Sequence, residues 1–350
     1  MDPTETQPER EERPRQRSIP ARRKFSFRAL RNALRMGHCA PAVMATACKG
    51  GRAEYESRVK LTAGLPGGIG MRGAECGCVT APLLFLGLVH GGDGGEEDSA
   101  RVVALGRRYL SRFRENYAGA TCREITGISW DDAEAVKKKG LGAFITCLRA
   151  ITGSPGILRE TLEEEDKLFG ADEKAAAAHA KLWRAFRDEG FHCSQSVLSD
   201  LEDVVDGLEE GRRASCGLLG GTALRGMTCS ALAAGVLALG AARGEIENSY
   251  LRVMRWMSMA FTALDKFMSD EGNKFNRAIN LGAELASWFE GEFGSTRCAE
   301  IVGADLSSPA GVEAYVAKGG PGRCREIARA VASRLREILA HAPEAAPAEE

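Results

Sequence analysis

The sequence predicts an all-α protein built as a tandem duplication of a small helical-bundle domain. A pattern of four widely spaced cysteines occurs twice along the 350 residues. Strand signals are weak, because alternating β-branched residues are scarce and aromatic residues make up only 6% of the chain. Ala, Leu, Arg and Glu, which favour helices, dominate the periodic stretches. We therefore expect a buried four-cysteine cluster within each helical half.

The cysteine repeat is the strongest of these signals. Its spacings are 37, 46 and 25 residues in the first half and 36, 69 and 26 in the second, so that only the middle interval differs, by an insertion of 23. Internal similarity in a constant order indicates a duplicated unit. The repeated residues are Cys39, Cys76, Cys122 and Cys147, followed by Cys193, Cys229, Cys298 and Cys324.

The same order of elements is expected in each half. An amphipathic helix reaches a His-Cys pair and is followed by a charged connector, a glycine-rich turn, a small-residue apolar helix, a longer helix with paired aromatics, and a terminal helix. The corresponding residues are His38-Cys39 and His192-Cys193, turns 64–73 and 217–226, apolar helices of roughly 79–89 and 230–242, and aromatic pairs Phe113/Tyr117 and Phe289/Phe293.

Proline inside the first apolar helix restricts where that helix begins. Pro82 lacks a backbone N–H and is tolerated in the opening turn of a helix. This places Cys76 just before the helix proper.

The domain boundaries follow from the repeat and from composition. Polar, charged termini without apolar residues cannot offset chain entropy and are expected to be disordered. The insertion, with Trp256 and several methionines, is expected to add a core helix rather than a partner surface. We expect tails at 1–24 and 341–350, repeats at 25–165 and 181–340 with the insertion near 250–278, and a linker or connecting helix at 166–180.

Charge and hydropathy exclude several classes of protein. A net charge of −1 argues against nucleic-acid binding. Val79 to Val89 is the most apolar run and is too short to span a bilayer. Arg22-Arg23 starts no export signal, because Arg28, Arg31 and Arg35 occupy the place of the required apolar segment. We therefore expect a cytoplasmic protein, in which eleven cysteines stay reduced unless they serve metal or redox chemistry.

Thiol redox chemistry is the leading interpretation of the repeated cysteines. Cys76 and Cys229 each precede an apolar helix, where unpaired amides and the helix dipole lower a thiol pKa. Both are predicted to be reactive thiolates that work with an unidentified redox partner. Nearby Arg72 and Arg225 would add positive potential, and His38 and His192 are candidate proton acceptors.

Two other interpretations remain open. Four thiolates per half match the ligand number of a zinc ion or a small iron–sulfur cluster, although the close C-x-x-C pairs typical of such sites are missing among the repeated cysteines. The cysteines would also suit a purely structural scaffold, because free cysteine packs as a small hydrophobe. That role is expected for the unrepeated Cys48, Cys78 and Cys216. Self-association into a homo-oligomer also remains open.

The chain resembles the C_GCAxxG_C_C family, a redox-active family with four characteristic cysteines and a C-G-A-x-x-G segment. The resemblance covers nearly the whole chain twice. The segments at Cys76 (Cys-Gly-Cys-Val-Thr-Ala) and Cys229 (Cys-Ser-Ala-Leu-Ala-Ala) each depart from the motif by two substitutions among small residues. The resemblance implies redox activity for the repeated cysteines. Cys39 and Cys193 are the first candidates for resolving partners, because a disulfide requires neighbouring Cα atoms, and Cys78 is a further ligand or resolving thiol.

Overall fold

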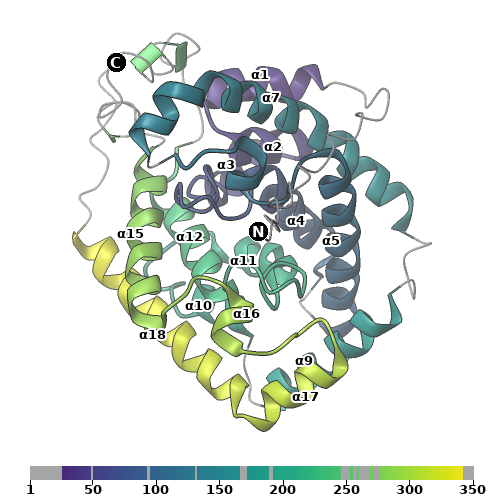
Figure 1. The fold of residues 1–350 in the computed structure, drawn as a ribbon. Helices are drawn as coiled ribbons and strands as arrows, with labels where there is room; N and C mark the ends of the chain where they lie inside the picture. The colour runs from purple at the N-terminus through teal and green to yellow at the C-terminus, as the bar shows by residue number, and fades with distance from the viewer. Residues whose placement is uncertain are drawn as a thin grey trace, which may run out of the picture.

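A computed structural model describes residues 26–341 except 49, 93–94, 131, 166–171, 189–191, 246–252, 255–257, 260–268 and 271–275. Within these residues the protein is helical, and the extended pairing consists of two isolated β-bridges (Figure 1). The predicted all-α class is confirmed. The predicted tails, and most of the inserted segment with Trp256, lie outside the described residues.

The first half contains helices α1 to α7. Their bounds are α1 Phe27–Met36, α2 Cys39–Ala47, α3 Arg52–Leu61, α4 Gly77–His90, α5 Glu96–Asn116, α6 Cys122–Thr126 and α7 Ala133–Glu163.

The second half begins with α9 and repeats this order. Its bounds are α9 Glu173–Asp188, α10 Cys193–Ser199, α11 Leu208–Ala214, the 3₁₀ turn η1 Ser215–Leu218, α12 Ser230–Arg243, α15 Asn276–Phe293, α16 Cys298–Val302, α17 Pro309–Ala317 and α18 Gly320–His341.

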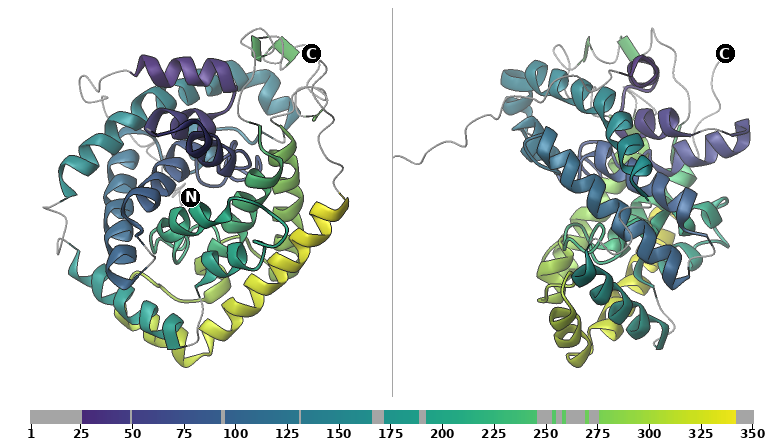
Figure 2. Two further views of the ribbon diagram at one scale, coloured as in Figure 1. Left: turned by 180° about the vertical axis from the view of Figure 1, so that it is seen from behind. Right: turned by 90° about the vertical axis from the view of Figure 1, so that its right-hand side faces the viewer.

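The two halves interlock through their central helices. Helix α3 of the first half packs against α12 of the second, and α11 of the second half packs against α4 of the first. In Figures 1 and 2 these four helices lie in the middle of the molecule, beside the longer helices α5, α15 and α18. A continuous hydrophobic core therefore runs through both halves.

Two equivalent glycines make this interlocking geometrically possible. A Cβ added to Gly87 of α4 would fall on the backbone carbonyl of Ala214 at the end of α11. A Cβ added to Gly240 of α12 would lie 2.5 Å from the carbonyl oxygen of Lys60, near the end of α3. The contact is thus made twice, with the roles of the halves exchanged, and it requires glycine because the facing atoms are backbone.

A buried carboxylate joins the halves near the two cysteine loops. Glu75 is 1% exposed and accepts hydrogen bonds from the hydroxyl of Thr222 (2.7 Å) and the backbone N–H of Thr228 (2.9 Å). The hydroxyl of Thr228 donates to its other oxygen. Glu75 directly precedes Cys76 and Thr228 directly precedes Cys229, so this contact connects the segments that position these two thiols.

The chain does not reach the first His-Cys pair as one continuous helix. Helix α1 ends at Met36, and Gly37 adopts a left-handed conformation (φ 75°) that stops the helix. Cys39 then opens α2, with His38 as the N-cap residue. The expected single helix was wrong at this point, and the break leaves Cys39 at a helix N-terminus.

The predicted apolar helices are confirmed, but the position of Pro82 differs. The helix begins at Gly77, with Cys76 as its N-cap residue, and Pro82 therefore lies beyond the first turn. Its missing N–H leaves the carbonyl of Cys78 without the usual helical donor. The hydroxyl of Tyr109 donates to this carbonyl at 2.6 Å, which offsets the loss.

The terminal helices differ between the halves. The first half has the long α7, which carries Cys147 near its middle. In the second half the corresponding stretch is divided into α17 and α18 at Gly319, whose φ is 72°. Helix α17 folds back against α9, and the two lie side by side in Figure 1.

Helix α7 is also the described helix whose length and composition would allow it to cross a membrane. Among the described helices, the stretch Glu134–Glu163 is long and apolar enough to cross a membrane by length and composition. Buried core helices meet the same criterion, and α7 packs against α1, α2, α5 and α6.

Candidate functional site

Three of the four repeated cysteines in each half lie at the start of a helix. Cys39 and Cys122 are the first residues of α2 and α6, and Cys76 is the N-cap residue of α4. Cys193, Cys229 and Cys298 hold the same places on α10, α12 and α16. The fourth cysteines, Cys147 and Cys324, lie within the terminal helices α7 and α18.

A backbone bridge fixes the second and third cysteines of each half next to each other. The N–H of Cys76 donates to the carbonyl of Ala120 at 2.9 Å, and the N–H of Cys122 donates to that of Ala74 at 2.6 Å. The second half repeats this pairing from Cys229 to Thr296 and from Cys298 to Met227. Two sequence-distant thiols are therefore held together by main-chain bonds that do not depend on side-chain identity.

The glycine-rich turns form left-handed turns that reach the first cysteine. Positive φ angles run through Gly67–Met71 and Gly220–Leu224, and they include the non-glycine residues Ile69 and Thr222. This conformation costs about 1 kcal/mol or more for each non-glycine residue. The backbone N–H of Gly67 hydrogen-bonds to the sulfur of Cys39, and that of Gly220 to the sulfur of Cys193. The turn thus places a backbone N–H donor beside the sulfur of the first cysteine in each half.

The thiols of the first half contact one another. Cys76 hydrogen-bonds with both Cys39 and Cys78. Cys122 receives a hydrogen bond from the indole N–H of Trp130, at 3.2 Å. Cys147 is close enough to Cys122 and Cys39 for their charges to affect its pKa.

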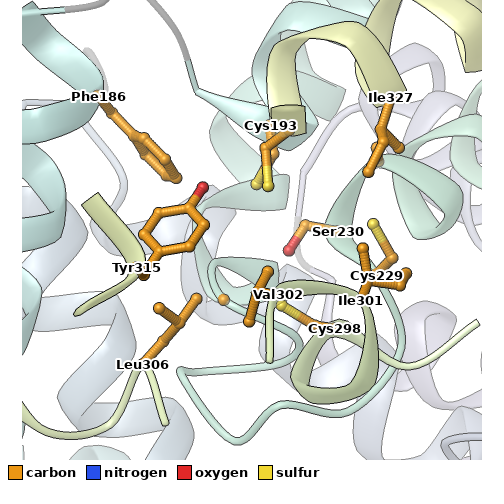
Figure 3. Close-up of a pocket in the computed structure, with 13 residues that line it drawn as sticks. Phe186, Cys193, Cys229, Ser230, Cys298, Ile301, Val302, Leu306, Tyr315 and Ile327 are labelled. Atoms are coloured by element: carbon orange, nitrogen blue, oxygen red, sulfur yellow. The ribbon is translucent and has the colours of Figure 1, made fainter. Parts of the chain in front are cut away.

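The four repeated cysteines of the second half line one small cavity (Figure 3). Its volume of about 20 Å³ holds little more than one water molecule. The buried hydroxyl of Tyr315 on α17 points toward Cys193 in Figure 3 and lies close to Cys324. The rest of the wall is mostly apolar: Phe186, Gly220, Ser230, Ala231, Ile301, Val302, Leu306 and Ile327.

Burial raises the pKa of the thiols, contrary to the lowering expected for Cys76 and Cys229. Loss of solvation raises the pKa of Cys229 to about 12, and it outweighs the amides of Leu232 and Ala231, which favour the thiolate. The hydrogen bond with Cys39 favours the thiolate of Cys76, but Cys78 and burial together raise its pKa well above the ordinary value. The backbone amides at the helix N-terminus favour the thiolate, as expected. Loss of solvation raises the thiol pKa by more than these amides lower it.

Solvent reaches only one cysteine of the contacting trio in the first half. Cys39 is partly exposed, whereas Cys76 is 4% and Cys78 0% exposed. Cys147 and, in the second half, Cys324 are also partly exposed. External reagents therefore meet Cys39 before Cys76.

The two histidines beside the first cysteines are buried N-cap residues. Nδ1 of His192 accepts a hydrogen bond from the backbone N–H of Gln195. His38 hydrogen-bonds with Asn276 at the start of α15, across the two halves. Burial lowers the pKa of His38 to about 4 and that of His192 to about 3, so both rings are neutral at pH 7.

The buried histidines predict acid sensitivity. Burial also lowers the pKa of His179 to about 4. Because the folded pKa values of these rings lie below 6.5, the unfolded chain binds more protons, and stability falls as pH drops from 6.5 toward 4. Urea unfolding at about pH 5.5 should show a free energy of unfolding lower by about 1 kcal/mol for each buried histidine than at about pH 7.5. An unchanged or higher value at the acidic pH would contradict this, and replacing the exposed His341 should leave the difference intact.

The described residues do not support a metal site directly. No three histidine, cysteine or acidic side chains among them are arranged to hold a metal ion. The four-cysteine cluster with iron–sulfur or zinc chemistry therefore stays a prediction. Arg72, expected to act on Cys76, forms an ion pair with Glu290 of α15 at 2.9 Å.

Sequence reasoning missed two contributors to the site. The indole of Trp130 donates to Cys122, whereas Tyr315 lines the cavity of the second half, and the two residues lie at non-equivalent places in the two halves. Cys78, which was expected to pack or to serve as a further ligand or resolving thiol, contacts Cys76. The C-x-C spacing of Cys76 and Cys78 was the one available signal.

The fold and the thiol sites together define a duplicated, all-helical cysteine protein. Residues 37–161 and 191–338 match the family model described as "Putative redox-active protein (C_GCAxxG_C_C)". The chain therefore belongs to the C_GCAxxG_C_C family and carries two tandem copies of its domain. No curated protein and no solved structure matched the chain.

Proposed function

We propose that the first half carries out thiol–disulfide exchange through Cys39 and Cys76. The observation that carries this proposal is the proximity of the two thiols: Cys39 and Cys76 hydrogen-bond with each other, and a Cβ added to Gly77, the residue after Cys76, would lie 2.6 Å from the sulfur of Cys39. A dithiol mechanism needs only this pair, whereas metal ligation needs three or four thiols to converge on one point.

Cys39 is the thiol that attacks the partner. It is partly exposed, and the amides of Gly67 and Ala40 favour its thiolate. These amides act against the hydrogen bond with Cys76 and burial, which together raise the pKa of Cys39 well above its ordinary value. Attack therefore requires approach of the partner to be coupled to removal of the proton. This assignment reverses the roles expected from the sequence, in which Cys76 attacks and Cys39 resolves.

The partner is a protein or small molecule that carries a disulfide. The Cys39 thiolate bonds to one sulfur of that disulfide, and the other sulfur leaves as a thiolate and takes a proton. Cys76 then loses its proton and attacks the sulfur of Cys39, which forms the Cys39–Cys76 disulfide and releases the second partner sulfur. The partner gains two electrons, and the Cys39–Cys76 pair loses two.

The second half is less suited to an external partner. Its four cysteines surround a cavity with room for about one water molecule, and α17 with Tyr315 lines that cavity. In the first half the residue that corresponds to Tyr315 is Lys138, which is exposed on the continuous helix α7.

Trapping of the disulfide tests this proposal. Anaerobically reduced protein is mixed with a small excess of oxidised glutathione, free thiols are alkylated, and peptides are mapped by mass spectrometry. We expect mixed disulfides on Cys39, followed by a Cys39–Cys76 linked peptide in the first half. Cys39→Ser should remove both species, whereas Cys76→Ser should leave the mixed disulfide in place.

The control is Cys48→Ala, which removes a buried thiol outside this pair and should leave the pattern unchanged. Equal labelling of all eight repeated cysteines would argue against a dithiol pair. Stoichiometric iron or zinc that disappears when any one of the four cysteines of a half is replaced would favour the metal interpretation.

A further inference from the structure

The first half contains a third thiol in contact with the proposed pair. Cys78 lies two residues after Cys76 in the first turn of α4, and Cys76 hydrogen-bonds with both Cys39 and Cys78. We call these three residues the thiol row. The second half has Ala231 at the corresponding position.

The thiol row runs from the surface into the core. Cys39 is partly exposed, Cys76 is 4% exposed, and Cys78 is 0% exposed. Gly77 lies between the two inner thiols. Because glycine has no Cβ, the sulfur of Cys39 can approach this position, where an added Cβ would lie 2.6 Å from it. The central sulfur thus has an exposed neighbour on one side and a buried neighbour on the other.

From this arrangement we infer that Cys78 accepts the disulfide from Cys39 and stores it in the core. This inference rests on the proposed exchange at Cys39 and Cys76. The sulfur of Cys78 attacks that of Cys76, the Cys39–Cys76 bond breaks, and a Cys76–Cys78 bond forms. The proton of Cys78 passes to the departing sulfur of Cys39. No electrons enter or leave the chain, so the step needs no added oxidant.

Hydrogen bonding and burial both act on the pKa values of the two end thiols. The hydrogen bond with Cys76 favours the thiolate of Cys78, and burial together with the other thiols then brings its pKa to about 11. The pKa of Cys39 is raised well above its ordinary value, first by its hydrogen bond with Cys76 and then by burial.

The transfer has a functional consequence for the exposed thiol. Once the disulfide lies between Cys76 and Cys78, Cys39 is again a free, partly exposed thiol. Reductants in solution reach the stored disulfide poorly, because both of its sulfurs are buried. Cys39 can then react with a second partner disulfide while the Cys76–Cys78 disulfide is still in place.

A time course of disulfide mapping tests the transfer. Reduced full-length protein is treated with one equivalent of oxidised glutathione, and samples are quenched in acid, alkylated and digested. In the unaltered protein the Cys39–Cys76 linked peptide should appear first and then decline. A peptide with an internal Cys76–Cys78 disulfide should replace it, while Cys39 becomes alkylated.

Two variants make the result decisive. Cys78→Ala installs the residue found in the second half, and it should hold the disulfide at Cys39–Cys76 throughout. Ala231→Cys adds a sulfur beside the second-half cavity that Ala231 lines, and it should allow an internal disulfide with Cys229. Cys48→Ala should behave as the unaltered protein.

The outcomes separate this inference from the proposed function. A Cys39–Cys76 disulfide that forms and persists in the unaltered protein would overturn the transfer and leave the exchange proposal standing. Absence of that disulfide from both the unaltered protein and Cys78→Ala would overturn the exchange proposal itself. The time course of the unaltered protein decides the question even where a variant fails to fold.

Discussion

Gly87→Ala should destabilise the protein by about 3 kcal/mol or more. The added methyl would fall on the backbone carbonyl of Ala214 at the end of α11, and backbone cannot rotate away as a side chain can. Helix α4 would have to move out from between the two halves, which opens the shared core. Chemical denaturation followed by circular dichroism measures the loss. Gly240→Ala should have a similar effect, because its Cβ would meet the carbonyls of Lys60 and Leu61.

The matched control is Gly142→Ala in α7. No atom lies within 4 Å of a Cβ added there, so that this variant should gain about 0.5 to 1 kcal/mol from helix propensity alone. If Gly87→Ala and Gly142→Ala changed stability equally, the close approach of α4 and α11 would not be a determinant of the fold.

Glu75→Ala should cost about 3 kcal/mol of stability. The change leaves the N–H and hydroxyl of Thr228 and the hydroxyl of Thr222 buried without their acceptor, and unpaired buried polar groups are costly. It also leaves a cavity where the carboxylate lay. The free energy of unfolding from urea denaturation gives the magnitude. Because these bonds position the loop before Cys229, alkylation of that cysteine in the folded protein should also become faster.

The exposed ion pair between Arg72 and Glu290 provides the comparison. It also connects the two halves, at 2.9 Å, but both side chains are substantially solvated. Glu290→Ala should therefore change stability by less than about 1 kcal/mol. Equal effects of Glu75→Ala and Glu290→Ala would mean that the buried hydrogen bonds make no special contribution.

Much of the fold could be read from local patterns. The cysteine repeat gave the duplication, and the apolar runs gave α4 and α12 nearly to the residue, with Cys76 and Cys229 as N-cap residues. The break at Gly37 was missed because a glycine inside a helical pattern does not by itself show a left-handed stop. The position of Pro82 was missed because the compensating hydroxyl of Tyr109 comes from a distant helix.

The site was predictable as a set of residues but not as a chemical environment. The repeat identified all eight cysteines, and the structure places six of them at helix N-termini. Their pKa values rise because burial removes water from the thiols, and burial depends on which helices pack over them. The contact of Cys78 with Cys76, the hydrogen bond from Trp130 and the place of Tyr315 in the cavity wall follow in the same way from packing.

Helix content, duplication and the identity of the repeated thiols were thus encoded locally, because periodicity and spacing act over a few residues of chain. The interlocking of the halves was decided only in three dimensions. The ends of α3 and α11 each pack against a glycine of the other half, and the carboxylate of Glu75 accepts its bonds from residues about 150 positions away. Such contacts depend on the simultaneous fit of distant surfaces, which no short stretch of sequence specifies.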